Sequence, residues 1–157
     1  MRLDIYGSSR SYADYAYYEN SGEFDENQLS VINQGFEAGL SPRQISIYAK
    51  PEFAVDQMQQ ILHGFQTGLS IRQVLVYANP EFDKYQMHIL WMGLKHANNS
   101  KMLEENVAEY ADPRFDANQM REILIGLFDG LSEDQVAAYA DPSLSAKEMR
   151  DRRSRLH

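Results

Sequence analysis

The stretch YANPEFDKYQMHILWMGL at residues 77–94 decides the fold, because the chain contains nearly the same text twice more. It occurs as YAKPEFAVDQMQQILHGF at residues 48–65 and as YADPRFDANQMREILIGL at residues 110–127. Repeats of this length are typical of architectures in which each unit buries its apolar face against its neighbours. The predicted units are residues 23–47, 48–76, 77–109 and 110–138, followed by the start of a fifth that reaches residue 146.

Each unit has the pattern of two helices. In the second unit, apolar side chains recur at i, i+3, i+4 and i+7, the spacing of a stripe on one face of a helix. They are Met58, Ile61, Leu62 and Phe65. A second, shorter helix follows until a proline such as Pro80 stops it. The sequence therefore predicts an all-α protein whose tandem two-helix repeats, about 29 residues each, form a short α-solenoid or a compact superhelical bundle.

Capping residues mark both ends of the first helices. Asp25, Asp83 and Asp116 each precede a glutamine by three positions, the spacing of a capping box that satisfies the free amide groups of a helix start. Ala54 departs from this pattern in the second unit. The helices are expected to end at glycine, which adopts the left-handed C-terminal cap without strain. These glycines are Gly39, Gly68 and Gly130.

A glycine also recurs inside each first helix, although glycine costs about 1 kcal/mol relative to alanine there. The positions are Gly35, Gly64, Gly93 and Gly126. Their recurrence predicts close contact between neighbouring helices. Tyrosines recur with the same period and are predicted to be core residues. They are Tyr48, Tyr77, Tyr110 and Tyr139.

The third unit departs from the pattern. Where its siblings have Gly-Leu-Ser, it has KHANNSKMLEEN at residues 95–106, which is four residues longer and lacks the capping glycine. We expect Asn98 or Asn99 to take the left-handed position there. A difference within a regular array is a place where function is added, although sequence drift explains it equally well.

Two segments of different character flank the repeats. Residues 1–22 are interpreted as a cap on the first repeat or as a flexible arm, because their tyrosine density is high and their glycines and serines argue against a long helix. The tyrosines are Tyr6, Tyr12, Tyr15, Tyr17 and Tyr18. Residues 147–157 are predicted to be a solvated basic tail or the frayed end of a helix, and the alternative is that they contact an acidic surface or nucleic acid. The candidate contacts in this tail are Arg150, Arg152, Arg153 and Arg155.

The net charge of −8 is unevenly distributed. Residues 147–157 contain five basic and two acidic side chains, so residues 1–146 carry a net charge of −11. Such a body repels nucleic-acid phosphates and favours a basic protein partner. The sequence has no cysteine, no apolar signal segment and no run of about eighteen apolar residues, so we expect a cytoplasmic location without membrane insertion.

The sequence contains no pattern of catalytic or metal-binding residues. His88 and His96 are eight residues apart, which does not place two ligands on one helix face, and no third ligand accompanies them. A glycine-rich phosphate loop, a G-x-S-x-G motif and a cysteine nucleophile are all missing. We therefore expect no enzyme activity, no cofactor and no metal.

The first helices vary most on the face opposite the apolar stripe. Earlier units are mostly polar there, whereas the later units have Ile89, Met92 and Ile125, with Phe128 at the flank. If exposed, these side chains form an apolar patch that suits a protein partner. The alternative is that the rebuilt turn at 95–106 or an adjacent helix covers them. The candidate partner-binding residues are Ile89, Met92, Ile125, Phe128, Tyr85, His88, Glu104 and Glu105.

The string GLSIRQVLVYA at residues 68–78 resembles the turn and second-helix start of a helix-turn-helix. A DNA-binding array of this kind would present Arg43 and Arg72 to a groove. The second helices carry at most one arginine each, and the fourth has Glu133 and Asp134 instead. Because this charge does not suit DNA, a DNA-binding helix-turn-helix regulator is the alternative function.

The whole repeat, YA-x-P-x-F-x-x-x-QM-x-x-I-x-x-G-x-x-x-GLS-x-x-Q over residues 23 to about 149, resembles helical-repeat proteins of bacterial mobile genetic elements such as phages and plasmids. The resemblance transfers no catalytic or binding residue. It implies the cytoplasm of a bacterial host cell, where small acidic proteins of such elements, anti-CRISPR proteins among them, bind defence or regulatory machinery. We therefore expect a non-catalytic inhibitor or adaptor that binds a bacterial defence or nucleic-acid-handling protein.

Overall fold

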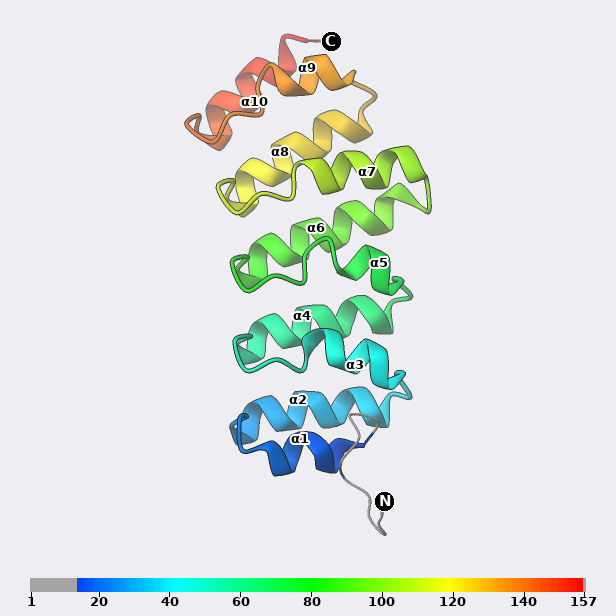
Figure 1. Cartoon of the computed structure of the whole chain (residues 1–157). Coiled ribbons are helices and arrows are strands. Elements are labelled where there is room, and N and C mark those ends of the chain that lie inside the picture. Colours follow the sequence, from blue (N-terminus) through cyan, green and yellow to red (C-terminus); the bar gives the residue numbers. More distant parts are fainter. Residues whose placement is uncertain (1–13, 157) are drawn as a thin grey trace. The chain divides into compact units, whose positions relative to one another are not determined.

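The computed structural model describes residues 14–156, which form ten helices and no strand. The all-α prediction is therefore confirmed. The chain divides into two compact units, one that ends at Pro80 and one that begins at Glu81. Figure 1 labels the helices of each unit. The expectation that the repeats build one solenoid across both units stays a prediction.

The first unit contains α1 (Tyr15–Ser21), α2 (Glu26–Glu37), α3 (Pro42–Tyr48), α4 (Val55–Gln66) and α5 (Ile71–Val74). The longer helices α2 and α4 pack against each other, and the short helix α3 contacts both (Figure 1). The remaining two helices flank this core, α1 against α2 and α5 against α4. First and second helices thus alternate as the sequence predicts.

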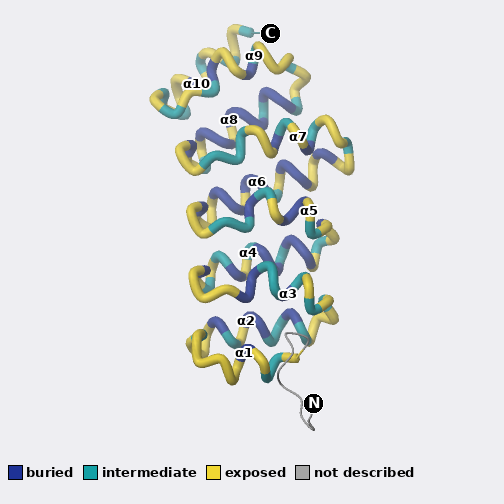
Figure 2. Tube along the Cα trace, in the orientation of Figure 1, coloured by how far each residue is buried: buried dark blue, intermediate teal, exposed yellow. Residues whose placement is uncertain are grey.

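The second unit contains α6 (Lys84–Ala97), α7 (Lys101–Glu109), α8 (Ala117–Phe128), α9 (Glu133–Ala137) and α10 (Ala146–Ser154). The central helix is α8, which contacts each of the other four. Figure 2 shows the buried residues of this unit concentrated in α6 and α8 and the exposed ones at the turns. The core of the unit therefore lies around α8.

The predicted capping boxes form at three of the first helices. Asp25, Asp83 and Asp116 each accept a hydrogen bond from the glutamine N–H three residues later, and that glutamine side chain accepts one in return. Ala54 lacks a polar side chain, yet Gln57 Oε1 still accepts from the Ala54 N–H at 2.8 Å. The predicted C-terminal glycines are all left-handed. Their φ angles are 81° at Gly39, 97° at Gly68 and 89° at Gly130.

Three of the glycines inside first helices make room for a tyrosine. A Cβ placed on Gly35, Gly64 or Gly126 would overlap the hydroxyl of the tyrosine thirteen residues later. These tyrosines, Tyr48, Tyr77 and Tyr139, are completely buried. The predicted close contact is therefore confirmed, and it joins a first helix to the tyrosine that opens the next predicted unit.

The third repeat fills the same space differently. Asn98 and Asn99 are both left-handed, with φ angles of 49° and 65°, and the longer helix α7 follows. A Cβ on Gly93 would lie 3.3 Å from a methyl group of Val107, which is completely buried. The prediction that Tyr110 is a core residue is wrong, since it is only half-buried. The four additional residues place it at the C-terminal cap of α7.

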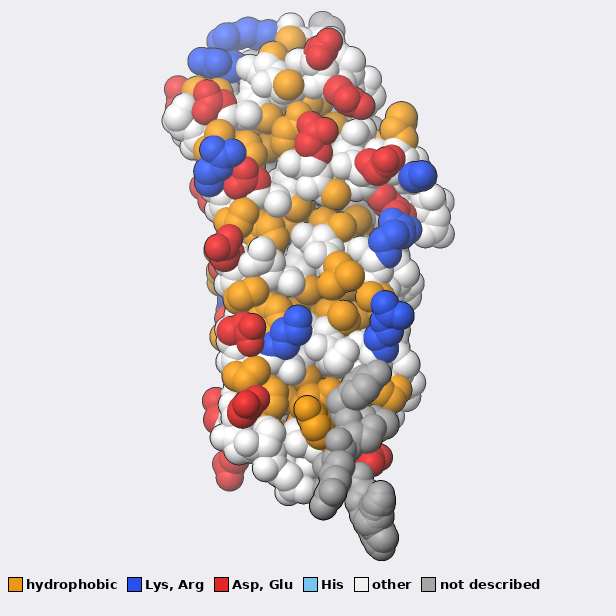
Figure 3. Space-filling view, in the orientation of Figure 1, with side chains coloured by type: hydrophobic (Ala, Val, Ile, Leu, Met, Phe, Trp, Pro, Cys, Tyr) orange, Lys and Arg blue, Asp and Glu red, His pale blue; other side chains and the backbone are white. Residues whose placement is uncertain are grey.

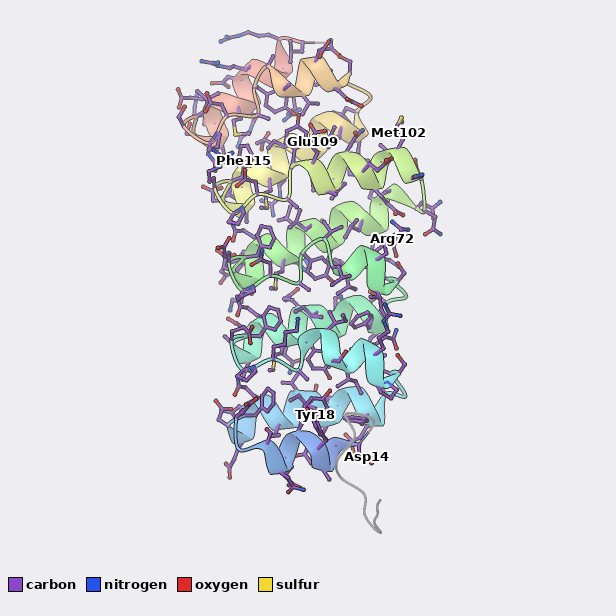
Figure 4. The ribbon with its side chains drawn as sticks, viewed as in Figure 1. Asp14, Tyr18, Arg72, Met102, Glu109 and Phe115 are labelled. Carbon is purple, nitrogen blue, oxygen red and sulfur yellow. The ribbon has the colours of Figure 1, made fainter. Side chains whose placement is uncertain are left out.

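Residues 14–22 cap the first repeat. Tyr18 is buried between α1 and α2 (Figure 4). Its ring meets that of Phe24 edge-on, with 6.0 Å between centroids, and Tyr15 meets Phe36 in the same way at 6.5 Å. The cap interpretation therefore holds for this part of the segment, whereas Tyr6 and Tyr12 lie outside the described residues.

Of the two expectations for residues 147–157, a basic tail or a helix end, the structure agrees with the helix, because these residues up to Ser154 belong to helix α10. Ser145 and Glu148 form a capping box at its start. Met149 is completely buried where α10 packs on α8. A helix forms here because the segment keeps the start signal and the first apolar residue of the repeat.

Candidate protein-binding site

A groove of about 310 Å³ lies between α6 and α8. Its walls are mostly apolar and its edges carry three polar side chains. The lining residues are Ile89, Met92, Gly93, His96, Arg121, Leu124, Ile125, Phe128 and Asp129. The four apolar residues predicted from the sequence, Ile89, Met92, Ile125 and Phe128, are thus brought together in one hollow.

The depth of the groove follows from the close approach of the two helices. Gly93 has no side chain, and Leu124 Cδ1 lies 3.0 Å from the position that a Cβ there would take. Ile89 is 4% exposed and lies at the bottom, whereas Met92 is 45% exposed at the edge. Ile125 and Phe128 are half-buried. The predicted patch is therefore neither covered nor flat.

One end of the groove carries polar groups. The His96 ring meets the Phe128 ring at an angle of 66° with 4.4 Å between centroids. Asp129 follows directly at the C-terminal cap of α8. Arg121 lies about two turns earlier on the same helix. A ligand in the groove would therefore meet apolar walls along its length, with a carboxylate at one end and a guanidinium farther along.

Two other predicted residues of α6 lie outside the groove. Tyr85 is 64% exposed, and His88 is exposed and stacks on Trp91 with 5.3 Å between ring centroids. Both belong to the first two turns of the helix, before the groove begins. They extend the exposed aromatic surface of α6.

The two predicted glutamates of α7 have different surroundings. Glu104 is 4% exposed, so its selection as a surface contact is wrong. It lies three residues before buried Val107 and therefore on the interior face of the helix. Glu105 is exposed and lines a shallow hollow of about 540 Å³. Other residues of that hollow are Lys101, Met102, Asn106, Glu109 and Glu133.

Acidic side chains gather over α7 and α9 on the face shown in Figure 3. Met102 and Glu109 stand near opposite ends of α7 (Figure 4). The first of these is 64% exposed. The second unit thus carries an apolar groove between α6 and α8 and, separately, an acidic surface on α7 and α9.

Two of the four arginines at residues 150–155 are paired with a carboxylate. Glu122 has a side chain only 7% exposed, and it accepts a hydrogen bond from Arg153 at 2.8 Å. Arg150 lies 3.5 Å from its other oxygen. Lys147 pairs with Asp151 at 3.1 Å. Arg153, whose side chain is 13% exposed, is held against Glu122, so its predicted role as an external contact is corrected, whereas Arg150 is 57% exposed and its predicted role stays a prediction.

The remaining arginines of α10, Arg152 and Arg155, are exposed. Hydrogen bonds from Ser143 hold the pKa of Asp141 below its usual range, and the nearby charge of Arg152 adds to this effect. Glu122 was missed by sequence reasoning, although a signal existed. Its position in the repeat is that of Val31 and Ile89, which are both buried.

Arg43 and Arg72 lie in the first turns of α3 and α5 and border one shallow hollow of about 730 Å³ (Figure 4 labels Arg72). Residues 14–80 contain eight acidic and three basic side chains. The helix with Arg72 is four residues long, whereas a recognition helix must reach along a major groove. These features do not favour a duplex-binding surface in the first unit.

Among residues 14–156, no three histidine, aspartate or glutamate side chains are grouped closely enough to hold a metal ion. No described helix has the length and apolar character needed to cross a membrane. In comparisons with known proteins, no family model matches the chain, and neither a curated protein nor a solved structure matches it.

Proposed function

We propose that the protein is a non-catalytic inhibitor or adaptor that binds a partner protein through the α6–α8 groove. The observation that carries this proposal is the apolar lining of the groove, where 45% of Met92 is exposed beside half-buried Ile125 and Phe128. Concave apolar surfaces with a polar edge are typical of protein interaction sites. A volume of about 310 Å³ suits one or two large side chains of a partner.

The charge of the second unit supports a basic partner. Residues 81–156 contain fourteen acidic and ten basic side chains, a net charge of −4, and the part before α10, residues 81–145, has a net charge of −7. Opposite charge speeds encounter and selects partners, while apolar contacts supply much of the affinity. Proteins that handle nucleic acid carry such basic surfaces. The proposed partner is therefore a defence or nucleic-acid-handling protein of a bacterial host, in keeping with the mobile-element proteins that the repeat resembles.

The test is an affinity capture from bacterial lysate with three baits: the wild type, Met92→Lys and Met102→Lys. Both methionines are exposed residues of the second unit, but only Met92 lines the groove. We expect the wild type and Met102→Lys to retain the same protein and Met92→Lys to lose it. Loss with both variants, or with neither, would contradict binding in the groove.

Half of each capture is treated with nuclease before washing. Retention of the partner in both halves supports direct protein binding. Retention only without nuclease would mean that nucleic acid bridges the two proteins. In that case the DNA-binding alternative predicts binding to a labelled duplex that falls steeply with salt and depends on Arg43 and Arg72.

A further inference from the structure

The glutamine in the third position of a first helix has two roles. Gln119 Oε1 accepts from the Asp116 N–H and closes the capping box. Its Nε2 donates to the carbonyls of Pro142 and Leu144, at 3.0 and 2.6 Å, in the connection that leads to α10. Gln28 and Gln86 do the same for the connections that follow them. The side-chain amide of this glutamine therefore fixes the connection that leads to the next first helix.

Two further features recur behind each of these glutamines. Four residues later stands an isoleucine or leucine that is at most 1% exposed. These residues are Ile32, Ile61, Leu90 and Ile123. Seven residues later stands the glycine that admits a side chain from the segment that follows the first helix. These glycines are Gly35, Gly64, Gly93 and Gly126. A donor, an apolar contact and an open space thus form the docking face of a first helix.

Helix α10 occupies the place of the next first helix and differs at all three positions. Glu148 replaces the glutamine. Its Oε1 accepts from the Ser145 N–H at 2.9 Å, but a carboxylate has no N–H to donate. These bonds from Ser145 hold the pKa of Glu148 below its usual range, so the side chain stays ionised at neutral pH.

Arg152 and Arg155 replace the other two features. Arg152 is exposed at the position where the inner helices bury isoleucine or leucine. Arg155 carries a long side chain at the position of the glycine. A tyrosine hydroxyl could not enter there, because even a single added carbon overlaps it at Gly35, Gly64 and Gly126. Each of the three contacts that receives a neighbour is therefore removed.

We propose that α10 is a cap, which docks on α8 through Met149 and Arg153 while its outer face prevents another repeat or a second copy from docking there. Terminal units of repeat proteins need a polar outer face, because an open docking face is adhesive. Association of this protein with others then uses surfaces other than the outer face of α10. This inference is independent of the proposed function, since it concerns a different surface.

The test restores the docking face with E148Q, R152I and R155G in one chain. A matched control carries E148N, R152Q and R155Q, which change the charge equally but supply no apolar contact or open space. Sedimentation equilibrium over a wide concentration range compares both with the wild type. We expect the mass of the restored variant to rise toward twice the monomer mass, whereas the wild type and the control stay constant.

A constant mass for the restored variant would overturn the proposal, as would equal association of variant and control or association of the wild type that the control abolishes. Circular dichroism checks that each chain folds. If the triple variant does not fold, the double variant E148Q/R152I, which leaves the last turn intact, is judged by the same criteria against E148N/R152Q.

Discussion

The hydroxyl of Tyr139 occupies the space that a side chain on residue 126 would need. It donates a hydrogen bond to the carbonyl of Glu122 at 2.8 Å. The ring is completely buried, so the tyrosine cannot move aside. Glycine at 126 and tyrosine at 139 thus form one structural element that fixes α9 on α8.

Replacing Gly126 with alanine should destabilise the protein even though alanine favours helix. Overpacking of a filled core costs about 1–3 kcal/mol, so we expect the free energy of unfolding to fall by about 2 kcal/mol. Urea denaturation followed by circular dichroism measures it. The control is Gly93→Ala, where the nearest atom belongs to the flexible end of Leu124. There we expect a change below about 1 kcal/mol, and equal costs at both sites would contradict this explanation.

The hydrogen bonds of Gln119 to the connection before α10 predict a large effect of a small substitution. Gln119→Glu keeps the acceptor of the capping box but turns an oxygen toward the carbonyls of Pro142 and Leu144. We expect a loss of about 2 kcal/mol, because two half-buried acceptors lose their donor beside a new charge. Gln135→Glu is the control, since its single outer bond to Leu156 is 3.3 Å long and half-buried. Urea unfolding should show little change there.

The ion pair beneath α10 predicts unequal roles for two arginines. Arg153 has a side chain 13% exposed, and Arg150 has one 57% exposed, although both contact Glu122. Arg153→Met should cost about 3 kcal/mol, because it leaves a buried carboxylate poorly paired. Arg150→Met should cost less than about 1 kcal/mol. Chemical denaturation of both variants measures the two losses, and equal losses would show that Arg150 contributes as much as Arg153.

The buried tyrosines predict instability in alkaline solution. Burial raises the pKa of Tyr48, Tyr77 and Tyr139 well above the usual value. Their stabilising effect is complete below the unfolded pKa of about 10 and declines as the pH rises above it. Each tyrosine adds up to about 1.4 kcal/mol per pH unit to that decline. Urea unfolding across this range should show it, and Tyr139→Phe should reduce the slope by about one proton.

Once a partner has been identified, the salt dependence of its affinity should distinguish the acidic surface of the second unit from the groove. The loss of affinity caused by Glu105→Lys and Glu109→Lys should shrink in high salt, because exposed charges are screened over about 10 Å at 0.1 M salt. The loss caused by Met92→Lys should persist, since it removes apolar contact. Titrations at low and high salt measure both. Equal salt dependence of both losses would argue against separate roles.

Most of the local structure could be predicted because it depends on neighbours in sequence. A capping box joins residues three apart, so Asp116 and Gln119 indicate a helix start without any tertiary information. Left-handed turns are equally local: the sequence predicted that Asn98 or Asn99 is left-handed, and both are. The recurrence of Gly126 with Tyr139 signalled close packing, although the spacing alone did not show that they meet.

The errors concern contacts between distant residues. Arg153 appeared to belong to a tail because its partner Glu122 is 31 positions away. Val107 could not be distinguished from other apolar residues as the one that approaches Gly93. The groove depends on both local spacing and contacts between distant residues. Helical spacing selected Met92 and Ile125, but the depth of the hollow depends on how closely α6 and α8 approach.

The turn at Asn98 and Asn99 offers a place to attach a reporter. Both side chains are exposed, and the turn lies two residues beyond His96 at the polar end of the groove. The chain has no cysteine, so one cysteine inserted between Asn99 and Ser100 would be the sole thiol. A dye attached to it would sit beside the groove without replacing any residue of its walls. Its emission would then signal the arrival of a binding partner.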